Sequence, residues 1–250
     1  MFLAPSDPLA LALVDALHAG QVAALQRLLA ERPGLGAARI GDAAESSPLL
    51  CVLADWPGNR PRGDESVRAL VAAGADPNGR GHGPRHQETA LHWAASSDDL
   101  PVLGALLDAG ADLEAAGAVI AGGTPLDDAV AFAQWRAARR LVERGARVAL
   151  WHAAALGLLD RVRGHLDGAA PLPAAHPWGG DARPRELDVA LWCAAHGDQR
   201  AAAELLLAHG ADPRWRSPWD GLSPAATARR QGAVELATWL EARAGASAGG

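Results

Sequence analysis

One short pattern recurs along this chain at a nearly constant spacing. It reads TALHWAA at residues 89–95, and clear relatives are TPLDDAV at residues 124–130 and LWCAAHG at residues 191–197. A Gly-Ala turn follows the first two, at Gly110 and Gly145, which lie 35 residues apart. A period of this size is typical of a solenoid, in which each unit buries its apolar face only against its neighbours.

Each unit carries the signals of two helices. Thr89 and Thr124 stand at N-cap positions, and Pro125 follows at the first helical position, where its missing N–H costs nothing. The segment 102–107 places leucines at helical spacing and predicts a second helix. Gly110 then ends that helix, because glycine readily adopts the left-handed conformation of a C-terminal cap. Stacked helix pairs are therefore the expected architecture.

This pattern resembles the ankyrin repeat over nearly the whole chain. The resemblance implies an all-α solenoid of helix-turn-helix units with short β-hairpin fingers. We expect one domain over residues 1–243, with a flexible tail at residues 244–250. The chain has no lysine and is rich in Arg, Ala and Gly, which we interpret as the bias of a GC-rich bacterial genome. The degenerate repeats are expected to begin near residues 7, 46, 88, 123, 149, 186 and 221.

Net charge, cysteine content and hydropathy argue against a nucleic-acid-binding protein, a cysteine metal site and a membrane protein. The formal net charge is −6, whereas nucleic-acid binders usually carry a basic face. Cys51 and Cys193 fall in different repeats without metal-ligand spacing, and are interpreted as core residues of a reducing compartment. No segment approaches the roughly 20 apolar residues of a membrane span. We therefore expect a cytoplasmic monomer that binds neither nucleic acid nor membrane and holds no metal or cofactor.

The period breaks at two adjacent junctions. Gly145 is followed after only 8 residues by Ala153 of the next inner helix, so the finger there is missing. The next junction, residues 168–185, is a long Pro/Gly-rich insertion that carries Trp178. Loops of this length are often functional. One hypothesis folds this loop across the groove, near Trp192; the rival is repeat decay, with the loop pointing away.

The resemblance also implies a concave groove formed by the inner helices and fingers. Trp is the aromatic residue most enriched at binding hot spots, and this chain has nine. The alternative for Trp93 and Trp192 is that they fill gaps between alanine-rich helices. His92, the histidine of the T-x-L-H pattern, is interpreted as a scaffold residue. The candidate binding residues are Asp55, Trp93, Asp128, Phe132, His152, Trp178, Trp192, His196, Trp215 and Trp219.

Two classes of function remain open. The resemblance implies a non-catalytic binding module that recognises a partner protein through the groove. The alternative is a small-molecule-binding protein or enzyme that uses an Asp/His/Trp-lined groove near residues 128–196, because paired carboxylates and imidazoles can do acid–base work. No nucleophile motif or phosphate loop is found, so no catalytic residue is assigned. An enclosed pocket would favour the alternative, and an open face would favour a protein partner.

Overall fold

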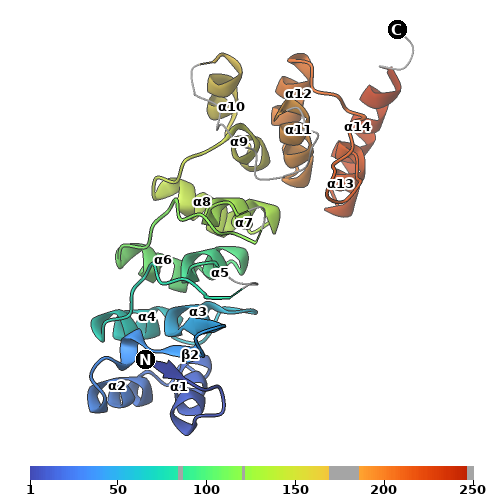
Figure 1. The fold of residues 1–250 in the computed structure, drawn as a ribbon. Helices are drawn as coiled ribbons and strands as arrows, with labels where there is room; N and C mark the ends of the chain where they lie inside the picture. The colour runs from blue at the N-terminus through green and yellow to red at the C-terminus, as the bar shows by residue number, and fades with distance from the viewer. Residues whose placement is uncertain (84–86, 120–121, 169–185, 247–250) are drawn as a thin grey trace. The chain divides into compact units, whose positions relative to one another are not determined.

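The computed structural model describes residues 1–83, 87–119, 122–168 and 186–246. Within them the chain is mostly helical, as the sequence predicts, and the helices pack as consecutive pairs. Contacts divide the chain into two compact units, Met1–Ala146 and Arg147–Gly250. Each unit has its own stack of helix pairs (Figure 1).

The helices of the first unit are α1 (Pro8–His18), α2 (Val22–Glu31), α3 (Leu49–Ala54), α4 (Gly63–Ala72), α5 (Ala90–Ser96), α6 (Leu100–Asp108), α7 (Pro125–Ala131) and α8 (Trp135–Glu143). The first helices of the pairs, α1, α3, α5 and α7, contact one another in sequence and form an inner layer. The second helices, α2, α4, α6 and α8, form an outer layer on the other side (Figure 1).

The helices of the second unit are α9 (Leu150–Leu156), α10 (Leu159–Leu166), α11 (Glu186–His196), α12 (Arg200–Ala208), α13 (Pro224–Arg230) and α14 (Val234–Ala246). The inner helix α11 packs between α9 and α13, and the outer helices α10 and α12 also contact each other. Because α14 continues to Ala246, it includes the first residues of the segment expected as a tail.

The helix ends form where the sequence signals them. The Thr124 side chain accepts from the backbone N–H of Asp127 at 3.4 Å, and the Asp127 carboxylate accepts from the Thr124 N–H, which makes a capping box. Thr89 makes the same kind of box with His92. Gly110 ends the outer helix of that repeat with a φ of +89°, a conformation that side chains resist.

The core is built from leucine and alanine. Ala94 and Ala95 of α5 are fully buried, which lets the inner helices approach closely, and Leu103 and Leu106 of α6 fill the space between the two layers. Cys51 and Cys193 are both buried free thiols. Burial raises the pKa of the Cys51 thiol to about 12, which keeps it protonated and unreactive.

A small sheet accompanies the fingers of the first unit. Strands β2 (Arg39–Gly41) and β3 (Ser46–Pro48) pair antiparallel as a hairpin between α2 and α3. Strand β1 (Phe2–Leu3) adds in parallel to β2, although the sequence pattern places no strand before the first repeat. The buried Leu3 side chain explains this, because pairing with β2 removes it from water.

The boundary between the units falls at the junction that lacks a finger. Residues 144–149 alone join α8 to α9, whereas residues 109–124 join α6 to α7. In that longer link the Gly122 N–H donates to the Ala118 carbonyl at 2.9 Å and closes a tight turn. One continuous domain over residues 1–243 remains a prediction. No helix among the described residues is long and apolar enough to cross a membrane.

Candidate functional site

Two of the histidines hold their own helices together. The Nδ1 atom of His92 accepts from the Thr89 N–H at 3.2 Å, so its Nε2 carries the hydrogen that is shared with the Gly123 carbonyl at 3.3 Å. His152 accepts from the Ala149 N–H at 3.1 Å in the same way. Burial lowers the pKa of His92 to about 4, so the ring stays neutral. His152, expected in the groove, therefore has the scaffold contact of His92.

In α11 the equivalent position holds Trp192. The helix begins at Glu186, one turn earlier than α5 begins in its repeat, so no capping histidine is needed there. The Trp192 ring is only 4 % exposed and stacks on His196, with ring centroids 5.2 Å apart and an interplanar angle of 24°. Its indole N–H has no hydrogen-bond partner among the described residues. Trp192 is thus held by ring contacts.

Two further tryptophans lie on the link between α12 and α13, residues 209–223, which we call the C-terminal finger. The Trp219 ring meets Trp192 edge-on at 5.1 Å, and Trp215 lies 5.6 Å from Trp219 at 60°. Both finger tryptophans are half-buried. Together Trp192, His196, Trp215 and Trp219 form an aromatic cluster, and all four are candidates that the sequence singles out.

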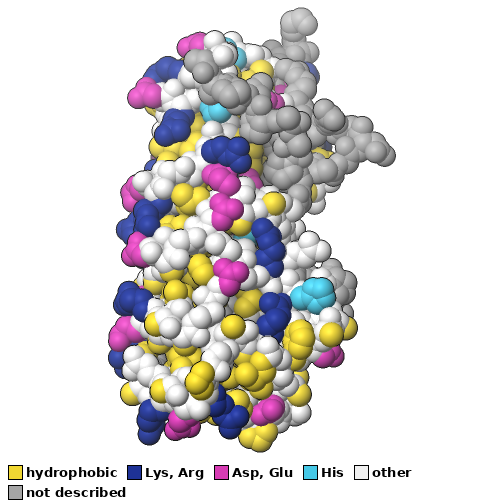
Figure 2. All heavy atoms as spheres, turned by 60° about the vertical axis from the view of Figure 1, so that its left-hand side comes forward, with side chains coloured by type: hydrophobic (Ala, Val, Ile, Leu, Met, Phe, Trp, Pro, Cys, Tyr) yellow, Lys and Arg dark blue, Asp and Glu magenta, His cyan; other side chains and the backbone are white. Residues whose placement is uncertain are grey.

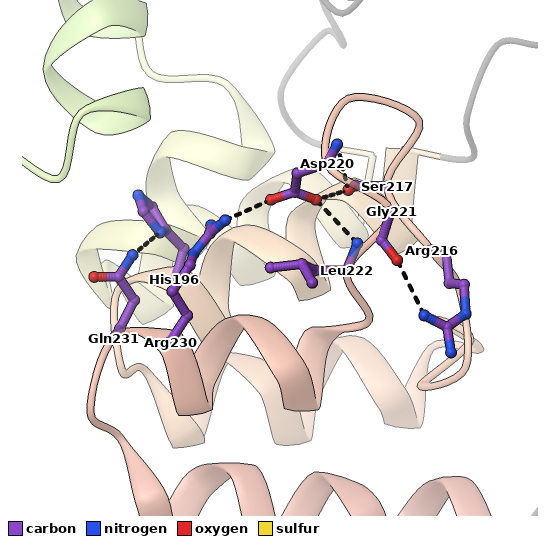
Figure 3. Close-up of polar contacts among 8 residues, drawn as sticks. All are labelled: His196, Arg216, Ser217, Asp220, Gly221, Leu222, Arg230 and Gln231. Carbon is purple, nitrogen blue, oxygen red and sulfur yellow. Dashed lines mark hydrogen bonds and ion pairs between the residues drawn. The ribbon is translucent and has the colours of Figure 1, made fainter.

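A polar network holds the finger over the inner helices (Figure 3). The Asp220 carboxylate accepts from the Ser217 hydroxyl, from the Leu222 N–H at 3.0 Å, and from Arg230 at 2.7 Å. Burial raises the pKa of Asp220, but these hydrogen bonds outweigh it and the pKa lies below its usual value. Charge-assisted bonds of this kind are stronger than neutral ones. Several side-chain hydrogen bonds therefore fix the conformation of the finger.

The same network reaches the aromatic cluster from α13. The Arg230 guanidinium carbon lies 5.7 Å from the Trp192 ring centroid, within cation–π range. The Gln231 amide donates to Nδ1 of His196 at 2.9 Å, so the imidazole hydrogen is on Nε2 (Figure 3). Ser217 and Asp220 are absent from the sequence-based candidates. The pattern S-x-x-D in the finger was the signal for them, since a hydroxyl and a carboxylate at this spacing bond reciprocally.

The other candidates do not join this cluster. Asp55 and Phe132 are exposed at the C-terminal ends of α3 and α7, and Trp93 is half-buried on α5. Asp128 is only 2 % exposed on α7. All four belong to the first unit and are described within it. Trp178, and with it the hypothesis that the insertion crosses the groove, lies outside the described residues.

Two open clefts lie on the described surface. One of about 670 Å³ lies between the C-terminal finger, α13 and α14, and another of about 620 Å³ lies beside Arg39 and Arg80. Among the described residues no group of three or more His, Cys, Asp or Glu could hold a metal ion. On the face drawn in Figure 2, described arginines and acidic side chains are interspersed without a continuous field of one sign.

Comparison with known proteins agrees with this architecture. Residues 86–118 match the family model of the ankyrin repeat. The crystal structure of the human ASB11 ankyrin repeat domain is similar with a TM-score of 0.54 and 21 % sequence identity, over 91 % of this chain and 96 % of that one. At this identity the likeness concerns the fold alone. No curated protein matches the chain. Residues 86–118 therefore form an ankyrin repeat, and the fold of the stacked helix pairs is that of an ankyrin-repeat domain.

Proposed function

We propose that this chain is a non-catalytic binding module that recognises a partner protein through its inner helices and fingers, with the aromatic cluster as its anchor. Ankyrin-repeat folds generally serve as protein–protein interaction modules. Fold analogy alone would not name a site. The proposal for this chain therefore depends on the aromatic cluster and its neighbours.

The observation that carries the proposal is the pair of half-buried tryptophans on the C-terminal finger. Trp219 packs on the buried Trp192, which stacks on His196, and Trp215 packs on Trp219. Asp220 links the finger to Arg230. Aromatic side chains that are held rigid before binding lose little conformational entropy when a partner covers them. Such rigid, partly exposed tryptophans are the side chains that most often dominate binding energy.

The same geometry favours binding over acid–base catalysis. His152 is committed to its own helix through Ala149, and Asp128 is buried in the first unit. A general acid or base must come within hydrogen-bond reach of the proton that it transfers. The described clefts are open, which suits a partner surface better than a small ligand enclosed on most sides. We propose that the protein acts as a monomer in the cytoplasm.

The proposal is tested by selecting partners from a random linear-peptide library displayed on phage. We expect wild-type protein to enrich peptides whose binding is weakened by more than about tenfold in Trp219→Ala, as expected for a hot-spot residue. Trp239→Ala is the matched control. Trp239 is also a half-buried tryptophan of the second unit, but it contacts Arg200 and Arg243 instead of the aromatic cluster.

The two variants separate a specific loss from a general one. Equal losses in Trp219→Ala and Trp239→Ala would indicate damage to the stack and contradict the proposed site. The same conclusion would follow if the selected peptides bound Trp219→Ala as tightly as wild type. Circular dichroism of both variants shows whether the helices are intact.

A further inference from the structure

A cleft lined by arginine lies beside the aromatic cluster. Its volume is about 670 Å³, and its walls are the C-terminal finger, α13 and α14. Arg230 links the two features, since it lines the cleft and also lies over the Trp192 ring. The arginine cleft, as we call it, is lined by Arg214, Arg216, Arg229, Arg230, Glu241 and the apolar residues between them.

The charge of the cleft contrasts with that of the chain. Four arginines and a single glutamate line it, although the whole chain has a net charge of −6. Arg229 pairs with Glu241 at 2.6 Å, and Arg230 pairs with Asp220 at 2.7 Å. Both side chains of the Arg229–Glu241 pair are about half exposed, so this pair is weak and can exchange for a ligand carboxylate.

Arg216 has no acidic partner among the described residues. Its guanidinium donates to the Gly221 carbonyl at 3.0 Å (Figure 3). Arg214, two residues earlier on the same finger, lies 3.6 Å from Asp212, which is a loose ion pair. The finger wall of the cleft therefore presents positive charge that the protein itself leaves only partly neutralised.

The floor between the arginines is apolar. Leu222 lies between Arg230 and Arg216 in Figure 3, and Ala225 and Ala226 of α13 line the cleft with it. Leu222 is half-buried, so an apolar side chain placed on it would remove surface from water. The cleft thus combines an apolar centre with guanidinium groups on both sides.

We propose that the arginine cleft binds an acidic segment of a partner protein, with carboxylates on Arg216 and its neighbours and an apolar side chain on Leu222. This inference rests on the proposed function and adds the chemistry of the partner. Arg binds carboxylates through two parallel hydrogen bonds. A free phosphate would use the guanidinium groups alone and leave the apolar floor exposed. The floor therefore favours a peptide over a small anion.

The test uses two fluorescein-labelled synthetic peptides and fluorescence anisotropy. One contains Glu-Leu-Glu units spaced by Gly-Ser, and its twin has Gln at every Glu. We expect the Glu peptide to bind wild-type protein about tenfold or more tightly than the twin, because hydrogen bonds to charged groups exceed neutral ones. Added NaCl should weaken that binding through screening. Inorganic phosphate should weaken the binding no more than NaCl does at the same ionic strength.

The variant Arg214→Gln/Arg216→Gln should lose most of the preference for Glu over Gln. Arg163→Gln is the matched control, because Arg163 is a similarly exposed arginine of the second unit that pairs with Asp160 on α10. Equal binding of the two peptides, no binding of either, or an unchanged double variant would each overturn the inference. So would displacement by phosphate beyond that by NaCl at the same ionic strength.

The failure of this inference differs from the failure of the proposed function. If the phage selection gives peptides that need Trp219 but are not enriched in Asp or Glu, the binding module stands and the acidic partner is refuted. If the selection gives no peptide that needs Trp219, the proposed function itself fails.

Discussion

The inner helices α5 and α11 each contact the finger that follows them, but they do so with different side chains at the same position. His92 and Trp192 occupy the same position in the sequences ALHWAA and ALWCAA, two residues before the paired alanines. His92 reaches the next finger by a hydrogen bond to Gly123, and Trp192 reaches the next finger by an edge contact with Trp219. The repeat of α5 therefore contacts the next finger through a hydrogen bond, and the repeat of α11 contacts it through packed aromatic rings.

The difference follows from where each helix begins. At the start of α5 the Thr89 N–H needs an acceptor, and His92 supplies it. Helix α11 begins one turn further toward the N-terminus. Position 192 therefore does not have to accept from an N-terminal backbone N–H, and it can hold an indole. The repeat of α11 lacks the scaffold histidine and has a buried indole instead, against which Trp219 of the finger packs.

The largest effect should come from removing that buried indole. Trp192→Ala should destabilise the protein by about 3–5 kcal/mol in urea unfolding, because it leaves a cavity under the finger. Trp192→Phe is the control, and should cost much less, since the indole N–H has no partner to lose. If both variants cost the same, ring contacts would not be what holds Trp192.

A proline in α5 should have the next largest effect. Ala94→Pro removes a backbone hydrogen bond in a fully buried turn and should cost about 3 kcal/mol or more. Ala201→Pro is the matched control, because the exposed Ala201 stands at the second position of α12, as Pro101 does in α6. Unfolding monitored by circular dichroism measures both. An Ala94→Pro variant as stable as wild type would contradict the helix assignment at residues 89–95.

The effect that is smallest per pH unit concerns acidification and separates the two ways of joining repeats. The pKa of His92 is lowered from 6.5 to about 4 in the folded state. Between pH 6.5 and about 4, His92 is therefore protonated in the unfolded chain but neutral in the folded one. The stability that His92 contributes is complete above pH 6.5 and falls by up to about 1.4 kcal/mol per pH unit as the pH drops toward 4.

The measurement is urea unfolding across this pH range for wild type, His92→Ala and His209→Ala. His92→Ala should show a shallower loss of stability on acidification, since the protonation penalty is gone. His209 is an exposed histidine on the outer layer, and His209→Ala is the matched control for the loss of an imidazole. Identical pH profiles for wild type and His92→Ala would refute the scaffold role of a neutral His92.

Local signals predicted the repeat architecture well. Thr124 followed by Pro125 marks a helix start, Gly110 marks a helix end, and both act within a few residues, so the pattern alone places them. The aromatic cluster was only partly predictable. Trp192, His196, Trp215 and Trp219 stood among the candidates, but so did His152, which the same capping contact as His92 explains.

The sequence by itself determined the helix pairs, the turns between them and the missing finger before α9, because each depends on neighbouring residues and a fixed period. Only the tertiary structure decided which tryptophans lie together. Trp192 and Trp219 are distant in the chain and meet because the finger folds back over α11, held by Asp220 and Arg230. Contacts between repeats depend on how the units stack, and the pattern within one repeat does not contain that information.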